Sequence, residues 1–540
     1  MQQTAPSSTP LEFDALVVGA GIAGLYQLYR LREMGLKVRA FDAAGEVGGT
    51  WYWNRYPGAR VDSMSYVYQY WFSDELLNEW DWSERFPAQP ETERYLNHVA
   101  DKFDLRKDIQ LNTRIAHAHW NDSTRRWTLT TEAGERFTAQ YFVSCSGMLS
   151  APVVPPFPGH EKFKGQIAHT ARWPESGLDL KGKRVGVVGT GATGIQVIQT
   201  IAPDVAELKV FQRTAQYAVP MKNDRYDAAA FAKWREKYPE FREKVHHTFA
   251  GFAFDFELPP YRSLTPAERI EALEKLWADG SLSFWVGGFT ETLVEEDINE
   301  EISNFVRAKI RARIKDPKVA DILVPSAYGF GTYRVPLENG YYDAFNRDNV
   351  ELIDVRATPI ERFTENGLVV DGREFELDVV ILATGFDAGT GALARMDVRG
   401  REGCSLTEMW NKDIRSTLGL QVHGFPNLFT VAGPLAPSTA FCNMATCLQQ
   451  QVDWVSDCIA FLRKHDKSVI EPTVEKENEW VTHHDEVANA TLMMRTNSWY
   501  TGANVEGKPR RLLSYIGGVG NYRKFCDEAK DSHYAGFEVA

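Results

Sequence analysis

The sequence predicts an α/β fold with two Rossmann-like dinucleotide-binding domains, each discontinuous in sequence, and a helical insertion in the second domain. Three observations support this fold class. Two glycine-rich turns, about 170 residues apart, each follow a buried strand and open a helix, as in a dinucleotide-binding βαβ unit. Helical periodicity replaces strand character between residues 226 and 330. Strand character then returns at 350–355, 367–370 and 379–383.

The bulk properties exclude several classes of partner. The chain has 540 residues, which corresponds to three or four domains at roughly 150 residues each. A net charge of −13 argues against nucleic acid and anionic membrane surfaces. No run of 18 apolar residues predicts a membrane span, and the polar N-terminus lacks a signal-peptide core. Six cysteines without a CxxC pair indicate a reducing cytoplasm, with no disulfide framework. No protein partner is implied.

The first glycine turn follows the strand Ala15–Ala20 and places glycines at Gly19, Gly21 and Gly24. Glycine at these positions allows a tight turn and lets the backbone approach a pyrophosphate at the N-terminus of the next helix. Asp42 ends the following strand, where an acid binds the ribose hydroxyls of a dinucleotide. Glycine turns alone are common, but strand, turn, helix and acid together predict a dinucleotide site.

The second glycine turn follows the strand that begins at Arg184, and it differs from the first at the end of its second strand. That strand ends in Arg213 and Thr214, with no acid. An arginine attracts a 2′-phosphate that an acid would repel, so the sequence predicts NADPH over NADH. The alternative is that Arg213 is a solvated surface charge. The residues expected to bind this dinucleotide are Gly189, Thr190, Gly191, Thr193, Gly194, Gln196, Arg213 and Thr214.

Two longer segments match family motifs at every fixed position. Phe163–Pro174 fits FxGxxxHxxxWP and lies just before the second glycine turn. Gly48–Asp62 has the sequence GGTWYWNRYPGARVD and fits a second pattern: Ala or Gly, then GxWxxxx, then Phe or Tyr, then Pro, then Gly or Met, then xxxD. Both segments resemble the motifs of the Baeyer–Villiger monooxygenases, in the single-component class of cyclohexanone and phenylacetone monooxygenases. The resemblance covers almost the whole chain, including Ala383–Ala388 and Trp499–Asn504. Within the first motif, His169 is expected to have a conformational role and no chemical one.

The resemblance implies FAD at the first turn, NADP(H) at the second, and no metal. It implies that NADPH reduces the flavin, that dioxygen gives a flavin 4a-peroxide, and that this peroxide converts a ketone to an ester or lactone. The absence of a CxxC pair argues against disulfide reductase chemistry. Further residues expected to contact the cofactors are Gly49, Thr50, Trp51, Asp62, Tyr68, Tyr333 and Trp499.

The implied chemistry needs a fixed positive charge beside a peroxide anion, and a guanidinium meets that need. By resemblance, Arg334 carries this role and Asp62 positions its guanidinium. Taken alone, each would more often be a surface charge. Many relatives carry lysine immediately before the arginine, and this chain has Tyr333. The NADPH assignment then depends on Arg213 and Thr214, with Tyr333 stacked on the adenine or the cofactor preference relaxed.

The segment Pro437–Met444 resembles the family's substrate-pocket loop. Phe441, Cys442 and Met444 are candidate pocket walls, with ordinary core packing as the alternative. The sequence does not identify the ketone, the enantioselectivity or the oligomeric state. Alternative functions are an N- or S-oxygenating flavin monooxygenase, a pyridine-nucleotide oxidase that releases hydrogen peroxide, and a flavin-binding regulator without enzyme activity.

The expected domain organisation follows from these elements and from the proline- and glycine-rich linker near residue 150. Thr265 to Glu268 has the form of a capping box, and apolar residues at helical spacing follow near Ile298. We expect an N-terminal tail at 1–13, an FAD-binding domain at 14–150 and 383–540, an NADP-binding domain at 151–225 and 331–382, and a helical subdomain at 226–330.

Overall fold

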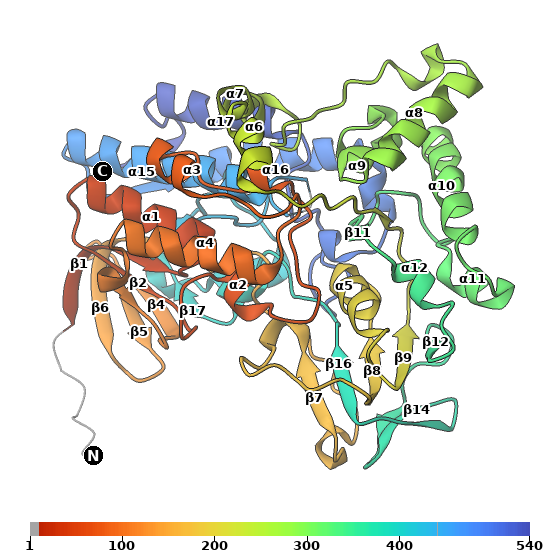
Figure 1. Cartoon of the computed structure of the whole chain (residues 1–540). Helices are drawn as coiled ribbons and strands as arrows, with labels where there is room; N and C mark the ends of the chain where they lie inside the picture. The colour runs from red at the N-terminus through yellow and green to blue at the C-terminus, as the bar shows by residue number, and fades with distance from the viewer. Residues whose placement is uncertain (1–9, 440) are drawn as a thin grey trace.

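The computed structural model describes residues 10–439 and 441–540, and it contains two main sheets flanked by helices (Figure 1). The first sheet has eight strands in the order β17-β4-β5-β6-β1-β2-β3, with β18 beside β6. Its strands are β1 (Leu11–Val18), β2 (Val38–Phe41), β3 (Ile109–Gln110), β4 (Ile115–Asn121), β5 (Arg126–Thr131), β6 (Arg136–Ser144), β17 (Asp397–Arg399) and β18 (Leu428–Thr430).

The centre of this sheet is parallel and buried. β1 pairs in parallel with β2 and β6, and the helix α1 (Ile22–Glu33) connects β1 to β2. The C-terminal part of the chain returns here, because β17 and β18 complete the sheet and α15 (Met444–Lys464) lies beside α1 (Figure 1). The Tyr26 hydroxyl of α1 donates to Asp453 Oδ1 of α15 at 2.7 Å. The first domain is therefore discontinuous, as predicted.

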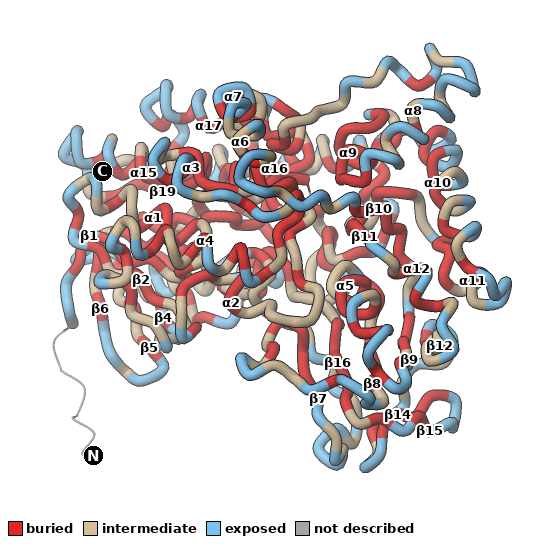
Figure 2. The backbone as a smooth tube through the Cα atoms, viewed as in Figure 1, coloured by how far each residue is buried: buried red, intermediate tan, exposed pale blue. Residues whose placement is uncertain are grey.

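The second sheet has five strands in the order β12-β9-β8-β16-β7, and all its pairs are parallel. Its strands are β7 (Gln166–His169), β8 (Arg184–Val188), β9 (Glu207–Gln212), β12 (Val350–Asp354) and β16 (Val379–Leu382). The helix α5 (Ala192–Ile201) joins β8 to β9. Figure 2 shows buried backbone along β8, β9 and β16. Because β12 and β16 come from beyond the helical insertion, this domain is also discontinuous, which confirms the predicted fold class.

The helical insertion lies between β10 (Val219–Pro220) and β11 (Leu337–Glu338). Its helices are α6 (Ala228–Arg235), α7 (Tyr238–His247), α8 (Pro266–Asp279), α9 (Ser283–Val286), α10 (Glu296–Arg311) and α11 (Pro317–Leu323). The predicted capping box is present, since Thr265 and Glu268 each bond the other's backbone N–H. Ile298 and Ile302 are buried on the inner face of α10, as their spacing predicted.

The remaining elements cover the sheets and the ends of the chain. The helices among them are α2 (Thr50–Trp53), α3 (Asp74–Glu79), α4 (Gln89–Lys102), α12 (Tyr341–Ala344), α13 (Gly391–Ala394), α14 (Leu406–Lys412), α16 (Val474–Asn489) and α17 (Val519–Asp531). The strands are β13 (Arg362–Phe363), β14 (Gly367–Val370), β15 (Arg373–Glu376), β19 (Ile470–Pro472) and β20 (Phe537–Val539). No helix within residues 10–439 or 441–540 has the length and apolar composition that crossing a bilayer requires.

The start of the first strand differs from the expected boundary at residue 14. β1 begins at Leu11, and Leu11 and Phe13 pair with Phe137 and Ala139 of β6. Pairing with β6 thus extends the strand upstream of the apolar run that predicted it. Residues 1–9 of the expected tail 1–13 lie outside the described residues.

The cysteine chemistry also differs from the expectation. Cys442 and Cys447 form a disulfide, although their spacing predicted none. The physical reason is local geometry: the loop before α15 folds back on the first turn of that helix and brings the two Cα atoms to 6.5 Å, within the range that a disulfide spans. The free cysteines are Cys145, Cys404, Cys458 and Cys526.

A close backbone contact joins the two domains. The Tyr56 hydroxyl donates to Gln196 Oε1 of α5 at 2.9 Å, and Gln196 Nε2 donates to the Arg60 carbonyl at 3.2 Å. Between them, Gly58 has a φ of +84°, and a Cβ built there would collide with the Thr200 hydroxyl and the Gln196 carbonyl. Only glycine fits this position, so the second motif packs its backbone directly on α5.

This packing predicts a specific cost for Gly58→Ala. The substitution combines left-handed backbone strain of about 1 kcal/mol with a clash against α5, so we expect a clearly lower Tm. The matched control is Gly134→Ala, because Gly134 has a φ of +87° and a Cβ added there would meet no atom within 4 Å. Thermal unfolding of both variants is the measurement. Equal Tm losses would show that the contact with α5 does not hold the domains together.

Candidate active site

A cavity of about 390 Å³ lies against the first glycine turn. Its walls come from segments far apart in the chain: the turn itself, the Gly48–Asp62 motif, residues 145–151, the α9 region, Arg334 and the loop before α15. Loops that connect the strands of both sheets, together with the helical insertion, thus line the same cavity. This is the expected position of a ligand in an α/β fold, beyond the carboxyl ends of the parallel strands.

The first glycine turn fits a dinucleotide. Gly19 has a φ of +110°, and a Cβ on Gly19 or Gly24 would collide with backbone carbonyls. Asp42 accepts backbone hydrogen bonds from Ala20 at 2.7 Å and from Ala44 at 2.8 Å. Burial raises the pKa of the Asp42 carboxyl, and these two N–H groups oppose the rise. Asp42 therefore fixes the shape of the turn and also lines the cavity.

Arg114, Arg172 and Arg395 line the same cavity. Burial lowers the pKa of Arg172, and repulsion from the Arg114 and Arg395 guanidinium groups lowers it further. The Arg172 guanidinium lies 4.3 Å from the centre of the Trp53 ring. Three positive charges that repel one another in a concave site fit an anionic group such as a pyrophosphate. None of the three was predicted from the sequence: Arg172 occupies an unspecified position of its motif, and Arg114 and Arg395 lie outside the motifs.

The Gly48–Asp62 motif forms the next part of the wall. Gly49 has a φ of +55°, and its Cα lies against Gly21 of the glycine turn. The Trp51 indole N–H donates to the Tyr68 hydroxyl at 3.2 Å, with the two rings perpendicular. Burial raises the pKa of Tyr68 to about 12, so its hydroxyl stays protonated at neutral pH. Gly49, Thr50, Trp51 and Tyr68 all line the cavity, as a cofactor-binding role requires.

Arg334 and Asp62 form an ion pair in the cavity wall. Arg334 Nη2 lies 3.1 Å from Asp62 Oδ2, and Nη1 donates to the Thr439 carbonyl at 2.9 Å. The guanidinium lies 5.7 Å from the centre of the Trp285 ring. The Arg334 side chain is 22% exposed and the Asp62 side chain is 10% exposed. Burial raises the pKa of Asp62, and the Arg334 guanidinium opposes that rise. The charge is thus held in place by the first domain, the pocket loop and the helical insertion.

The second oxygen of Asp62 is buried. Asp62 Oδ1 has no hydrogen-bond partner within 3.5 Å among the described residues, although the Leu337 N–H helps to lower the pKa of the carboxyl. A buried carboxylate oxygen without a donor is costly. Asp62 and Arg334 were predicted from the sequence, whereas Thr439 and Trp285 were not, because they meet the arginine only in the folded chain.

The second glycine turn also fits a dinucleotide. Gly189 has a φ of +105°, and a Cβ on Gly194 would collide with the Gly189 carbonyl. A Cβ on Gly191 would meet nothing within 4 Å, so the backbone there faces open space. The Thr190 hydroxyl donates to the Thr214 carbonyl at 3.0 Å and ties the turn to the end of β9. The turn therefore has the conformation of a dinucleotide-binding turn, and its backbone is open on the side where a pyrophosphate would lie.

Arg213 and Tyr333 gather beside this turn. Arg213 is exposed at the end of β9. Burial raises the pKa of Tyr333, and the nearby Arg213 charge opposes that rise. The Tyr333 hydroxyl donates to the Asn497 carbonyl, and its ring lies 4.4 Å from Tyr328. The tyrosine that replaces the expected lysine is thus fixed at the same end of the site as Arg213.

Three of the expected cofactor residues lie elsewhere or have other contacts. Gln196 is 4% exposed, and its amide is engaged by Tyr56 and Arg60 across the domain interface. Thr193 faces the same tyrosine hydroxyl. Trp499 packs beside Tyr500, with ring centres 4.4 Å apart, and lies outside the cavity lining. The spacing of the motifs places these residues near the site, but does not show which groups they face.

His169 joins two connections between the domains. Its Nδ1 accepts from the Ala171 N–H at 3.0 Å, and its Nε2 lies 3.2 Å from the Thr384 hydroxyl. That hydroxyl donates to the Val153 carbonyl at 2.6 Å. Burial lowers the pKa of His169, so the ring stays neutral. These contacts are compatible with the expected conformational role.

One group of side chains in the described residues has metal-ligand chemistry: His117, His119 and Asp397, at the edge of the first sheet. The Arg399 guanidinium bonds the same Asp397 carboxylate at 2.9 Å. The arginine already neutralises that carboxylate and would repel a cation. We therefore keep the expectation that the protein uses no metal.

The fold and the cavity define a protein with two dinucleotide-binding sites, and comparison with known proteins identifies its family. A model of flavin-binding monooxygenase-like proteins matches residues 14–226. The chain is 56% identical to acetone monooxygenase (methyl acetate-forming) of Gordonia sp. (strain TY-5), over 98% of this chain and 99% of the relative. It is 42% identical to a Baeyer–Villiger monooxygenase of Pseudooceanicola batsensis, over 97% and 95% of the two chains.

Among solved structures, OTEMO in complex with FAD and NADP superimposes with a TM-score of 0.95 at 39% identity, over 99% of this chain and 100% of that one. The chain belongs to the Baeyer–Villiger monooxygenases. Its cofactors are FAD and NADP(H), as predicted from the two glycine turns together with the family resemblance.

The position of Arg213 predicts the cofactor preference. Arg213→Ala should raise the KM for NADPH about ten- to hundredfold, because a charged hydrogen bond contributes about 1.5–3 kcal/mol. The KM for NADH should change little. Steady-state kinetics with both cofactors is the measurement, and Arg136→Ala, an exposed arginine of β6 in the first sheet, is the control. Equal efficiency with NADPH and NADH in the wild type would contradict the assignment and direct attention to Tyr333.

Proposed function

We propose that this enzyme converts small ketones, including acetone and other methyl ketones, to esters with NADPH and dioxygen. One observation carries the proposal: the Arg334 guanidinium, paired with Asp62, forms part of a cavity wall that it shares with the first glycine turn. Full-length similarity to an acetone monooxygenase at 56% identity supports the substrate class.

In this proposal, bound FAD, once reduced by NADPH, supplies the oxygen-activating chemistry. Arg334 stabilises negative charge that develops on the oxygen donor and on the ketone carbonyl oxygen, because its charge is permanent and lies in a partly dry wall. Asp62 holds the guanidinium in one orientation and limits its movement. Thr439 completes the arrangement through its carbonyl, which connects the arginine to the pocket loop.

The pocket loop supports a small substrate. Phe441, Cys442 and Met444 line the cavity, and Phe441 is only 2% exposed. Its ring centre lies 5.7 Å from Trp285 and 5.4 Å from Tyr500. A tightly packed aromatic at the wall excludes bulky ketones by filling the space that they would need. We assign the loop to the substrate side of the cavity on this basis.

Nitrogen oxygenation is the second candidate function. It is favoured by one relative, named phenazine N-monooxygenase PhzNO1 of Lysobacter antibioticus, at 41% identity over 97% of this chain. We further propose a cytoplasmic location and no requirement for a protein partner. The net charge of −13 supports the absence of a nucleic-acid partner.

Product identification tests the function. The enzyme is incubated with NADPH, dioxygen and single substrates: acetone, a linear ketone, cyclohexanone, an aryl ketone and a phenazine. Mass spectrometry should find esters, with the highest efficiency for the small methyl ketones. NADPH consumption that yields only hydrogen peroxide would establish an oxidase, and an N-oxide without ester would establish the second candidate.

The ion pair predicts the effect of Arg334→Ala. The variant should bind FAD and accept hydride from NADPH, but ester formation should fall at least about a hundredfold, the loss seen when one oxyanion-stabilising donor is removed. Arg334→Lys is the matched control, since it keeps a charge without the planar fork. Its rate of ester formation should lie between those of the wild type and Arg334→Ala. Anaerobic flavin reduction and ester yield are measured separately. Ester formation near the wild-type rate would show that Arg334 is misassigned.

The pocket loop predicts a change of substrate range. Phe441→Ala should raise the ratio of kcat/KM for a bulky ketone over acetone about tenfold or more, because each methylene in a pocket contributes about 1–3 kcal/mol and an aromatic cavity rarely collapses. Phe525→Ala, on α17 and outside the cavity lining, is the control. An unchanged ratio in a folded, fully flavinated variant would remove Phe441 from the pocket.

A further inference from the structure

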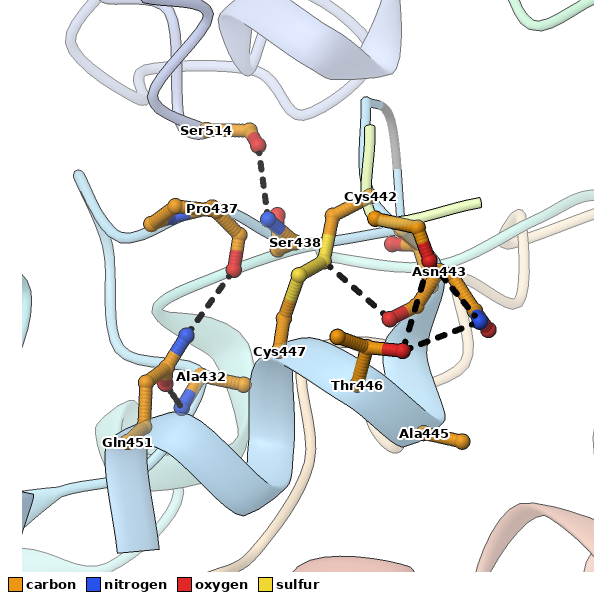
Figure 3. The surroundings of a disulfide bond; sticks show 12 residues. Ala432, Pro437, Ser438, Cys442, Asn443, Ala445, Thr446, Cys447, Gln451 and Ser514 are labelled. Atoms are coloured by element: carbon orange, nitrogen blue, oxygen red, sulfur yellow. Dashed lines mark hydrogen bonds between the residues drawn. A yellow bond between two sulfur atoms is a disulfide. The ribbon is translucent and has the colours of Figure 1, made fainter. Parts of the chain in front are cut away.

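The disulfide Cys442–Cys447 lies where the pocket loop enters α15 (Figure 3). Cys442 lines the cavity and is 7% exposed, whereas Cys447, in the first turn of the helix, is 2% exposed and lies outside the cavity lining. The two residues pack with Val519 in a small apolar cluster. The pair is therefore shielded from bulk solvent, while a small molecule in the cavity can reach Cys442.

The helix side of the pair is fixed without the disulfide. Asn443 Nδ2 donates to the Val67 carbonyl at 2.8 Å, and the Asn443 N–H donates to the Ala250 carbonyl at 2.7 Å. The Thr446 hydroxyl donates to the Gly251 carbonyl at 3.3 Å. These bonds connect the start of α15 to the first domain and to the helical insertion. Cys447 therefore keeps its position whether or not the disulfide is formed, and a change of the bridge moves Cys442.

The loop side of the pair is connected to the catalytic arginine. The Pro437 carbonyl accepts from Gln451 Nε2 at 3.1 Å, as Figure 3 shows, and the Thr439 carbonyl accepts from Arg334 at 2.9 Å. Cys442 Sγ lies 3.3 Å from the Asn443 carbonyl oxygen, so a reduced thiol has a local acceptor there. Movement of the loop at Cys442 would therefore change both the pocket wall and the position of the carbonyl that Arg334 bonds.

We propose that Cys442 and Cys447 form a reversible redox site, closed by hydrogen peroxide and reopened by a dithiol, whose state sets the shape of the pocket loop and the range of ketones accepted. The redox chemistry of the pair does not depend on the proposed function. The consequence for ketones rests on it.

The chemistry balances with peroxide as the oxidant. The Cys442 thiolate attacks a peroxide oxygen: an S–O bond forms, the O–O bond breaks, and hydroxide leaves as water. The Cys447 thiolate then attacks the sulfenic sulfur: the S–S bond forms, the S–O bond breaks, and a second water leaves. Two thiols lose two electrons and one peroxide becomes two waters. A dithiol reverses the change by thiol–disulfide exchange and is itself oxidised to its disulfide.

The position of the pair favours a local response. The N-terminal turn of a helix stabilises negative charge, and Cys447 lies in that turn of a 21-residue helix. The bridge closes a short loop, because the two cysteines are separated by 5 positions, and short loops contribute little to global stability. Reduction should therefore change the loop without unfolding the domain.

The first measurement reads the thiols directly. The FAD-loaded enzyme is treated with a dithiol or with hydrogen peroxide, freed of reagent, denatured and alkylated, and the modified peptides are quantified by mass. Peroxide should remove alkylation from Cys442 and Cys447 together, and the dithiol should restore it. Cys404, which is exposed and free, serves as an internal control for oxidation without a partner. Full alkylation of Cys447 after peroxide would overturn the proposal, whatever the enzyme's substrate.

The second measurement reads the pocket. The ratio of kcat/KM for a bulky ketone over acetone should differ at least threefold between the oxidised and the reduced wild type. Cys447→Ser should match the reduced wild type before peroxide is added and should form no bridge afterwards, because Cys442 then has no partner thiol, while Cys404→Ser should respond as the wild type does. FAD content and Tm show whether each variant is folded. If Cys447→Ser does not fold, the kcat/KM ratios of the oxidised and the reduced wild type are compared directly. A bridge that forms while the ratio stays constant would overturn the link to substrate range.

Discussion

The ion pair between Arg334 and Asp62 depends on every large part of the molecule being in place. Asp62 comes from the first domain, Arg334 follows the helical insertion, Thr439 belongs to the pocket loop and Trp285 to α9. Removing either member of a largely buried pair leaves an uncompensated charge, which costs several kcal/mol. The pair is thus both a chemical group and a geometric constraint, because it forms only when the two domains and the insertion meet correctly.

The docking of the two domains has a simple physical basis. Gly58 lets the backbone of the second motif lie directly on α5, and Gln196 bonds that motif with both of its amide atoms. Asp62 lies four residues after Gly58 in the same segment. The contact of Gly58 with α5 is therefore only a few residues from the Asp62 carboxylate that bonds Arg334. A change in the domain contact should alter the position of this carboxylate.

Much of the fold could be predicted from sequence because its requirements are local. The glycines at 19, 24, 189 and 194 are dictated by positive φ or by carbonyls that leave no room for a Cβ, and each such demand admits one residue type. The capping box at Thr265 is equally local. The Arg334–Asp62 pair was inferred from family resemblance, since nothing in its spacing of 272 residues indicates contact.

The features that the sequence did not predict involve residues that are far apart in the chain or that meet only when the chain folds. Arg114, Arg172 and Arg395 lie far apart in the chain, and only folding brings their charges together. The bonds that Gln196 makes with Tyr56 and Arg60 were not predicted either, because they form only where the two domains meet. The disulfide depends on a loop that folds back on a helix, which no spacing rule describes.

The most direct test of the central claim is a double-mutant cycle on ester formation with Asp62→Asn, Arg334→Ala and the double variant, each loaded with FAD. If Asp62 acts by holding Arg334, the double variant should be no more than about threefold slower than Arg334→Ala, because the partner has nothing left to hold. Losses that multiply, so that each substitution costs the same factor with or without the other, would show that the two residues act independently and would contradict the account.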